Sequence, residues 1–301
     1  MAKPGKRQPV SIAVPASIAN LGPGLDTLAL AVTLYLRVRV RRVEGANHLQ
    51  FRFVNLELQG ENLIDRGFRR LAGEREFPSL DVEVETDIPL RSGLGSSAAA
   101  VAAGFRIFEA VFGPQPVSTL LAAGCELEGH PENVAAAVLG GLVACCQRAD
   151  GSVIALPAAW PRALRIVVAT PEAQLETRRS RAVLPASVAL SSAVGNLQRV
   201  AVLLEALRGR NYAVLAEAFR DCLHQPSRSS IVPCLEPLLA MRHPDLLGVF
   251  LSGSGPSVAA VATRHLGQVA ELMARTFRQG GVNCQTRIVG VHPAGADGPA
   301  A

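Results

Sequence analysis

Residues 89–100 carry the densest set of chemically useful groups in the chain, and read Pro-Leu-Arg-Ser-Gly-Leu-Gly-Ser-Ser-Ala-Ala-Ala. The alternating stretch 80–87 before them is typical of a half-buried strand, and the apolar stretch 101–112 after them is typical of a helix. A strand that turns through glycines into a helix directs several backbone N–H groups and the positive end of the helix dipole at one place. The glycines allow a phosphate to approach closely, and the serine hydroxyls add donors or a metal ligand. The stretch therefore predicts a nucleotide triphosphate site.

Other interpretations of this stretch remain open on the residues alone. A short Gly/Ser turn before a buried helix is often only a helix cap. Residues 93–98 also fit a degenerate Gly-x-Gly-x-x-Ala dinucleotide motif, which normally has an acidic residue about 20 positions later. Only Glu109 lies near that position, inside the expected helix. A Walker loop is excluded because no Gly-Lys-Ser/Thr occurs in the sequence.

Two further segments present polar side chains from rigid turns. The expected loop 15–26 contains two glycines and a proline around Asn20 and Asp26, although an ordinary Asx-capped turn would look the same. Pro131 is well placed in the first turn of a helix, with a glutamate and an asparagine beside its N-terminus. The neighbouring His130 is equally consistent with a structural histidine bonded to a backbone carbonyl.

Composition limits the class of protein. A chain of 301 residues with 49% hydrophobic residues can bury one large core or, as we expect, two packed domains. No apolar run of about 18 residues predicts a membrane span, and the N-terminus lacks the apolar region of a secretory signal, so we expect a cytoplasmic protein. The net charge of +5 comes from scattered basic residues, which a groove for an anionic nucleotide explains at least as well as nucleic acid.

Cysteine and lysine usage narrows the chemistry further. The six cysteines show no paired metal spacing, and we expect them to be reduced and mostly buried: Cys125, Cys145, Cys146, Cys222, Cys234 and Cys284. The only lysines are Lys3 and Lys6, in an N-terminal tail that we expect to be loose. No lysine in the rest of the chain can therefore act as a catalytic base, a phosphate clamp or a Schiff-base nucleophile.

The remaining sequence predicts the elements that position these groups. Strands are expected at 9–14, 27–43, 48–54, 80–87, 142–146, 153–155, 164–170, 247–251, 257–262 and 284–289. Helices are expected at 62–72, 101–112, 117–128, 131–141, 187–207, 212–223, 234–241 and 266–279, with a short basic helix or loop at 174–185 and turns at 224–228 and 252–256. Strands and helices mix without a regular βαβ repeat, which favours the α+β class. A domain boundary is expected near 157–161, and a loose tail after Val291.

Three separated segments, 15–26, 89–100 and 251–257, resemble motifs one, two and three of the GHMP kinases in the correct order, and together they span most of the chain. The resemblance implies a two-domain fold. Its N-terminal ATP-binding domain, residues 1–160, would be like ribosomal protein S5, and its C-terminal domain, residues 161–301, would be a ferredoxin-like α/β sandwich.

Within this superfamily, four segments are similar to the homoserine kinase family: 20–26, 129–134, 177–181 and 224–228. Mevalonate kinases and diphosphocytidyl-methylerythritol kinases carry a lysine in motif one that this chain lacks. The resemblance implies ATP-dependent phosphorylation of L-homoserine with Mg²⁺, a step toward threonine. Another GHMP kinase for a small alcohol, and an inactive nucleotide-binding regulator of the same fold, remain as alternatives. The sequence does not decide between a monomer and a homodimer.

The resemblance also implies roles for individual residues. The nucleotide would be bound by Pro89, Leu90, Arg91, Ser92, Gly93, Leu94, Gly95, Ser96, Ser97, Ala98 and Ala99, with Asn62 a guess for the adenine. The amino acid would be bound by Asn20, Asp26, His130, Glu132, Asn133, Arg181, Arg228 and Gly253, with the two arginines on its carboxylate. Ser97 and Glu128 would hold Mg²⁺, with Glu126 as the alternative carboxylate. Asn133, Glu128 and Thr177 would be catalytic. Glu132 departs from the family, which usually has aspartate there, and its longer side chain would place the carboxylate differently.

Overall fold

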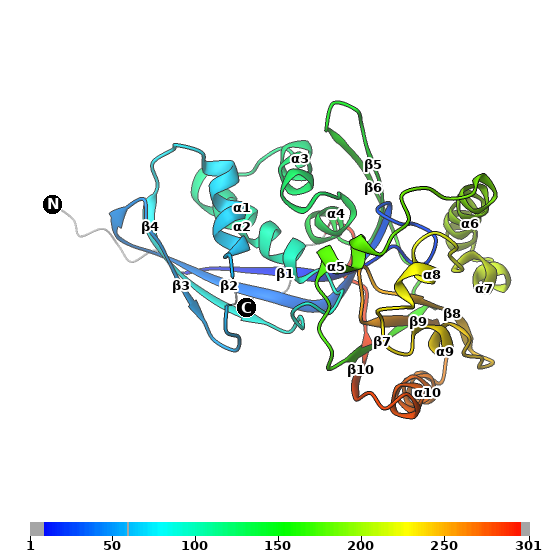
Figure 1. The fold of residues 1–301 in the computed structure, drawn as a ribbon. Coiled ribbons are helices and arrows are strands. Elements are labelled where there is room, and N and C mark those ends of the chain that lie inside the picture. The colour runs from blue at the N-terminus through cyan, green and yellow to red at the C-terminus, as the bar shows by residue number, and fades with distance from the viewer. Residues whose placement is uncertain (1–8, 59, 296–301) are drawn as a thin grey trace.

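The computed structural model describes residues 9–58 and 60–295, and contains two β-sheets with helices packed against them (Figure 1). The α+β prediction is confirmed. The predicted N-terminal tail with Lys3 and Lys6 lies outside the described residues. None of the described helices is long and apolar enough to cross a membrane.

The larger sheet has the strand order β3-β4-β2-β5-β6, with β1 also paired to β2. Its strands are β1 (Val10–Ala19), β2 (Leu28–Ala46), β3 (Leu49–Phe53), β4 (Pro78–Thr86), β5 (Leu142–Gln147) and β6 (Val153–Ala158). Only the β3–β4 pairing is parallel. In β2 the arginines at 37, 39 and 41 are partly or fully exposed, and the residues between them are buried, as their alternation predicts.

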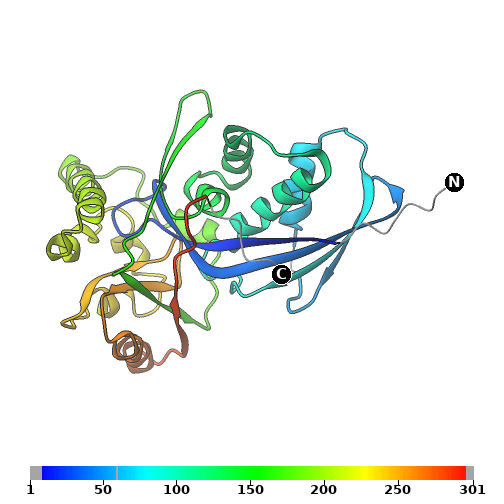
Figure 2. The same ribbon diagram turned by 180° about the vertical axis from the view of Figure 1, so that it is seen from behind.

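Four helices cover one face of this sheet: α1 (Leu63–Ala72), α2 (Ser96–Phe112), α3 (Val117–Glu128) and α4 (Glu132–Leu139). In the view from behind, they again lie on one side of the blue strands β1 and β2 (Figure 2). Glycines allow helices α1 and α2 to pack closely. A Cβ on Gly67 would lie only 2.4 Å from the Val101 carbonyl oxygen, and a Cβ on Gly104 would lie only 2.2 Å from the Ile64 carbonyl oxygen. This packing fixes the axis of α2, the helix that begins in the 89–100 stretch.

The smaller sheet is antiparallel, in the order β10-β7-β9-β8. Its strands are β7 (Arg165–Pro171), β8 (Leu246–Leu251), β9 (Val258–Ala262) and β10 (Cys284–Val289). Ile166 and Val168 of β7 pack with α6 (Leu190–Gly209) and α7 (Leu215–Ala218). Val167 and Ala169 face α9 (Leu235–Leu239) and α10 (Leu266–Gln279) on the other side. The first of these clusters continues into the core of the larger sheet, so the two sheets share apolar packing.

Several element boundaries differ from the sequence predictions. Strand β1 continues through Pro15 to Ala19, because the register with β2 shifts between Pro15 and Ala16, and a bulge accommodates a proline within a pairing. The loop that follows is therefore only 20–27. The helix expected at 212–223 is a 3₁₀ turn, η1 (Tyr212–Val214), followed by α7, which ends at Ala218.

Two segments are more ordered than predicted. Residues 224–228 contain a short helix, α8 (Gln225–Arg228), in place of a turn, and 174–185 contains α5 (Thr177–Ala182). The tail predicted to be loose after Val291 is held at its start, because the His292 backbone bonds to Ala31 and Gly141 at 3.0 and 2.8 Å and Gly295 N–H donates to the Leu139 carbonyl at 2.8 Å. The rest of that prediction, residues 296–301, lies outside the described residues. The change from one sheet to the other falls between Ala158 and Arg165, and the division into two domains there stays a prediction.

The six cysteines are free, as expected, but only Cys125 and Cys145 are buried, and Cys146 is exposed. Burial raises the pKa of the Cys145 thiol to about 12, so this side chain is an unreactive apolar group at neutral pH.

Candidate active site

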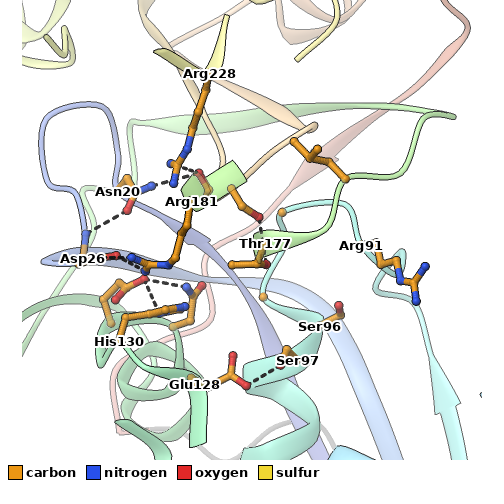
Figure 3. A pocket seen from close by; sticks show the side chains of 17 residues that line it. Asn20, Asp26, Arg91, Ser96, Ser97, Glu128, His130, Thr177, Arg181 and Arg228 are labelled. Atoms are coloured by element: carbon orange, nitrogen blue, oxygen red, sulfur yellow. Dashed lines mark hydrogen bonds and ion pairs between the residues drawn. The ribbon is translucent and has the colours of Figure 1, made fainter. Parts of the chain in front are cut away.

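One pocket of about 590 Å³ brings together all the residues predicted to bind the amino acid, to hold the metal or to act in catalysis (Figure 3). These residues are Asn20, Asp26, Ser97, Glu128, His130, Glu132, Asn133, Thr177, Arg181, Arg228 and Gly253. They come from the β1–β2 loop, the start of α2, the α3–α4 junction, α5, α8 and the turn after β8. Glu126, the alternative carboxylate for the metal, is exposed, pairs with Arg70 at 2.5 Å and does not line this pocket.

The predicted nucleotide loop lines the pocket only in part, through Arg91, Gly93, Gly95, Ser96 and Ser97. The other predicted members do not line it. The Ser92 hydroxyl donates to the Pro89 carbonyl at 2.7 Å and closes the turn. The side chains of Leu94, Ala98 and Ala99 are buried in the apolar core, because the inner face of α2 packs on β1. Leu90 is 42% exposed.

The N-terminus of α2 opens toward the pocket without a side-chain cap. Its N-cap is Gly95, in the left-handed conformation with φ 69°, where a Cβ would lie 2.1 Å from the Ser17 hydroxyl oxygen. A side chain at this position would displace the Ser17 hydroxyl, and the positive φ also favours glycine. Because the first N–H groups of a helix lack intrahelical acceptors, this end of α2 can bind an anion.

Ser97, in the first turn of α2, donates a hydrogen bond of 2.5 Å to Glu128 Oε1 at the end of α3. Burial raises the pKa of the Glu128 carboxyl, and the bond from Ser97 partly opposes that shift. A hydroxyl and a carboxylate held together beside an open helix N-terminus form an oxygen donor set of the kind that Mg²⁺ prefers.

A chain of polar side chains lies behind this pair, at the start of α4. Ser17 donates to Asn133 Oδ1 at 2.7 Å, and Asn133 Nδ2 donates to Glu132 Oε1 at 2.8 Å. His130 Nδ1 lies 3.0 Å from the same Glu132 oxygen, without the alignment of a hydrogen bond. Burial disfavours a charged His130, but the adjacent Glu132 carboxylate outweighs it and raises the pKa of the imidazole.

Glu132 has an unused acceptor. Its side chain is 2% exposed, and Oε2 has no hydrogen-bond partner among the described residues. Oxygen or nitrogen atoms of Asp26, His130 and Glu132 lie within 4.8 Å of one another. A buried carboxylate oxygen without a donor is costly, so this position favours a ligand that supplies an N–H or O–H group.

The two predicted carboxylate-binding arginines lie in different surroundings. Arg181 Nη2 and Nη1 contact Asp26 Oδ1 and Oδ2 at 2.6 and 3.0 Å, a bidentate pair that is partly exposed to solvent. Hydrogen bonding to Asp26 raises the pKa of Arg181. Arg228 is 2% exposed and has no ion-pair partner within the described part of the chain.

Arg228 is held by neutral acceptors. Nε donates to the Ser180 carbonyl at 3.3 Å, and Nη1 donates to Gly253 O at 3.1 Å and to His224 Nδ1 at 3.0 Å. Nη2 makes no hydrogen bond to any described residue. Burial lowers the pKa of Arg228 to about 10, so the group is still charged at neutral pH. A buried cation with an unused donor edge favours an anionic ligand.

The remaining predicted residues have clear positions. Asn20 lines the pocket at φ 72°, and its Nδ2 donates to Gly253 O at 3.1 Å. The Thr177 hydroxyl is 3.4 Å from that of Ser254. Asn62, the guess for the adenine, accepts bonds from the Ile64 and Asp65 N–H groups as the N-cap of α1, outside this pocket.

Sequence reasoning missed three residues at the site. Ser254 and Leu175 line the pocket, and Ser17 supports Asn133 from β1. The prediction for the 252–256 turn includes only Gly253 as a site residue. The prediction for 15–26 places Ser17 in a loop, whereas it lies in β1, where the last six residues are all buried.

Comparison with known proteins gives consistent matches. Residues 62–141 match the family model of the GHMP kinases N terminal domain. Homoserine kinase of Moorella thermoacetica is 38% identical over 290 residues, which cover 92% of this chain and 95% of that protein. Homoserine kinase of Solibacter usitatus is 37% identical over 282 residues, 91% of each protein.

Solved structures agree on the fold. The crystal structure of homoserine kinase from Cytophaga hutchinsonii has a TM-score of 0.85 at 24% identity and covers 98% of both chains. That of L. major mevalonate kinase in complex with R-mevalonate has a TM-score of 0.72 at 16% identity, and covers 98% of this chain and 100% of that one. These likenesses confirm the predicted fold class.

Proposed function

Because the chain belongs to the GHMP kinases, and within them to the homoserine kinases, we propose that it transfers the γ-phosphoryl group of ATP to the side-chain hydroxyl of L-homoserine, yielding O-phospho-L-homoserine for threonine biosynthesis. The observation that carries the proposal is the division of one pocket into two ends. The phosphate end consists of Gly93, Gly95, Ser96, Ser97 and Glu128, and the amino-acid end consists of Asn20, Asp26, Arg181, Arg228 and Gly253.

At the phosphate end, the N–H groups that open α2 would bind the triphosphate, with Gly93 and Gly95 leaving room for it. The uncapped start of the helix supports this role, because it offers donors and a positive dipole end together. Arg91, which is partly exposed at the pocket rim, adds a positive charge.

The Ser97 hydroxyl and the Glu128 carboxylate would hold Mg²⁺, and their oxygen chemistry fits that ion. When bound, the ion would neutralise charge on the phosphate oxygens. If the hydroxyl of Ser97 turned its proton away from Glu128, an oxygen lone pair of each residue would be available for the ion.

At the amino-acid end, the charges match those of a zwitterion. Arg228 Nη2 and the Arg181 fork would bind the carboxylate, and Asp26 would accept from the ammonium group. Asp26 and Arg181 form an ion pair with each other in the free protein. Bound homoserine would replace this pair with two others, one between Asp26 and its ammonium group and one between Arg181 and its carboxylate.

The reacting hydroxyl would lie between the two ends. Asn133 would orient this hydroxyl. The neighbouring Glu132 accepts from Asn133 through Oε1, and its free Oε2 could accept a hydrogen bond from the substrate, which supports a substrate contact of Glu132. Thr177 would add a hydrogen bond. Phosphoryl transfer depends mainly on positioning and charge neutralisation, so a pocket without a lysine among its lining residues can perform it.

We infer action on a small molecule in the cytoplasm, without nucleic acid or membrane as a partner. A homodimer is the oligomeric state to test. An inactive nucleotide-binding regulator is the alternative from another functional class, and the intact set of Glu128, Arg181 and Arg228 argues against it.

The first experiment measures ADP release from Mg-ATP with and without L-homoserine, with mevalonate and L-threonine as controls. Homoserine-dependent release, absent with both controls, is the expected result. ATP binding without release on homoserine would contradict the substrate assignment, and a screen of other small alcohols would then separate a different kinase from an inactive regulator.

A further inference from the structure

His224 is a buried titratable group behind the pocket lining, and the proposed reaction assigns it no role. Its side chain is 0% exposed, and it immediately precedes α8, four residues before Arg228. It does not line the pocket. It lies behind Arg228, between this arginine and the β1–β2 loop.

The contacts of His224 determine where its proton is. Nδ1 is 3.0 Å from Arg228 Nη1, and a guanidinium can only donate, so Nδ1 must be the acceptor. Nε2 is 2.8 Å from the Gly22 carbonyl oxygen, which can only accept, so Nε2 must carry the proton. The imidazole is therefore neutral, with its hydrogen on Nε2. A doubly protonated ring would direct an N–H at a guanidinium.

The chain around His224 holds the ring in place. Asp221 Oδ2 accepts from the backbone N–H groups of His224 and Gln225, at 2.9 and 2.7 Å. Gln225 Oε1 accepts from the Leu251 N–H at 2.7 Å, which ties α8 to the end of β8. Charged groups that face the ring are Asp221, with Oδ2 3.7 Å from Nε2, and Arg228, with Asp26 acting from farther away.

We propose that His224 is a positioning residue for the substrate carboxylate: its neutral ring holds the Arg228 guanidinium through Nη1, and leaves Nη2 free to bind the ligand. The inference rests on the proposed function. With Nε fixed on Ser180 and Nη1 fixed on His224 and Gly253, the plane of the guanidinium is set before the substrate arrives. The same ring, through Gly22, links that plane to the loop that carries Asn20 and Asp26. Preorganised donors bind a carboxylate with less ordering cost than a free arginine does.

Two substitutions separate the two bonds of the ring. In His224→Asn the amide lies near the position of Nδ1 and can still accept from Arg228, but it does not reach Gly22. In His224→Gln the amide lies near the position of Nε2 and can still donate to Gly22, but Arg228 Nη1 loses its bond to the ring and keeps only the one to Gly253. Both variants also remove ring volume, so each serves as the packing control for the other.

The expected result is a KM for L-homoserine that rises about tenfold or more in His224→Gln, with a KM for ATP within about twofold of the original. His224→Asn is expected to raise the homoserine KM less. Equal changes in both KM values, no change in either variant, or a larger homoserine effect in His224→Asn would overturn the inference. If the unmodified protein shows no homoserine-dependent turnover, the proposed function is wrong, and this outcome is distinct from a failure of the role of His224.

A measurement on the unmodified protein covers the case in which both variants fail to fold. Nitrogen-15 NMR of histidine-labelled protein at about pH 7.5 reports the tautomer of each ring. The Nε2–H form is expected for His224. An Nδ1–H form or an imidazolium would overturn the proposed role, because neither can accept from Arg228.

Discussion

The phosphate end and the amino-acid end of the pocket are built in different ways. At the phosphate end, backbone N–H groups of one continuous stretch open a helix, and the side-chain pair of Ser97 with Glu128 joins two neighbouring helices. At the amino-acid end, side chains of the β1–β2 loop, α5, α8 and the turn after β8 converge, and Asn20 and Gly253 are 233 positions apart. One end therefore depends on local conformation, and the other depends on how the two sheets pack.

The charged side chains at the two ends of the pocket also have different direct partners. Glu128 has a hydroxyl as its direct partner, and Arg228 has only neutral acceptors. Asp26 and Arg181 neutralise each other. Single substitutions at the two ends should consequently affect different kinetic constants, which is a direct test of the division.

The largest effect is expected at the phosphate end, from Glu128→Gln. Removing the carboxylate should lower kcat by about 100- to 1000-fold, because a group that stabilises developing charge is lost. The half-saturating Mg²⁺ concentration should rise, and the KM for homoserine should hardly change. Glu126→Gln is the matched control, two residues away on the same helix and exposed beside Arg70, and it should leave all three constants unchanged. A comparable loss in both variants would contradict the role of Glu128.

The next largest effect is expected at the other end, from Arg228→Met. The KM for homoserine should rise about 100-fold, as expected for the loss of charge-assisted hydrogen bonds to a carboxylate, and the KM for ATP should hardly change. Arg208→Met, at a side chain that is 78% exposed, provides the control for loss of one positive charge. Equal effects on both substrates would refute a dedicated carboxylate site, and thermal unfolding of each variant would show whether the fold is retained.

Ser97→Ala should have a smaller effect, of about tenfold on kcat, because a neutral ligand contributes less than a carboxylate. The Mg²⁺ requirement should rise in a titration of activity against metal. An unchanged metal dependence would remove Ser97 from the ligand set, and would leave it as a hydrogen-bond donor to Glu128 alone.

The smallest effect concerns pH at the amino-acid end. Burial lowers the pKa of His224, and the nearby Asp221 carboxylate only partly opposes this shift. A lowered pKa means that the ring takes up a second proton only below the usual range of histidine, so it should stay neutral from about pH 8 to pH 6.5. Its NMR signal should not move over that interval. A titration centred at or above the ordinary value would show that Arg228 loses its acceptor near neutral pH.

Most of the phosphate end could be predicted from the sequence. Residues 80–112 fold as a strand, a turn and a helix because neighbouring residues decide local conformation, and the glycines at 93 and 95 adopt the positive φ values that such a turn requires. The choice between Glu126 and Glu128 could not be made in this way. Residues two apart on a helix point about 200° away from each other, and only the packing of α3 against α2 decides which one meets Ser97.

The sequence by itself predicted the α+β class and the order strand, turn and helix over residues 80–112, although α2 begins at Ser96 and not at the expected residue 101. It also predicted a set of amino-acid-binding residues that the structure places in one pocket, and it contains no lysine in residues 7–301. The tertiary structure decided which of these groups are paired and which are free. Asp26 and Arg181 are 155 positions apart, and their pairing depends on where α5 lies against the β1–β2 loop. The proton position on His224 likewise depends on Gly22, 202 positions away. Burial and hydrogen bonding of a side chain are properties of the packed neighbours, and residue type and local spacing do not contain them.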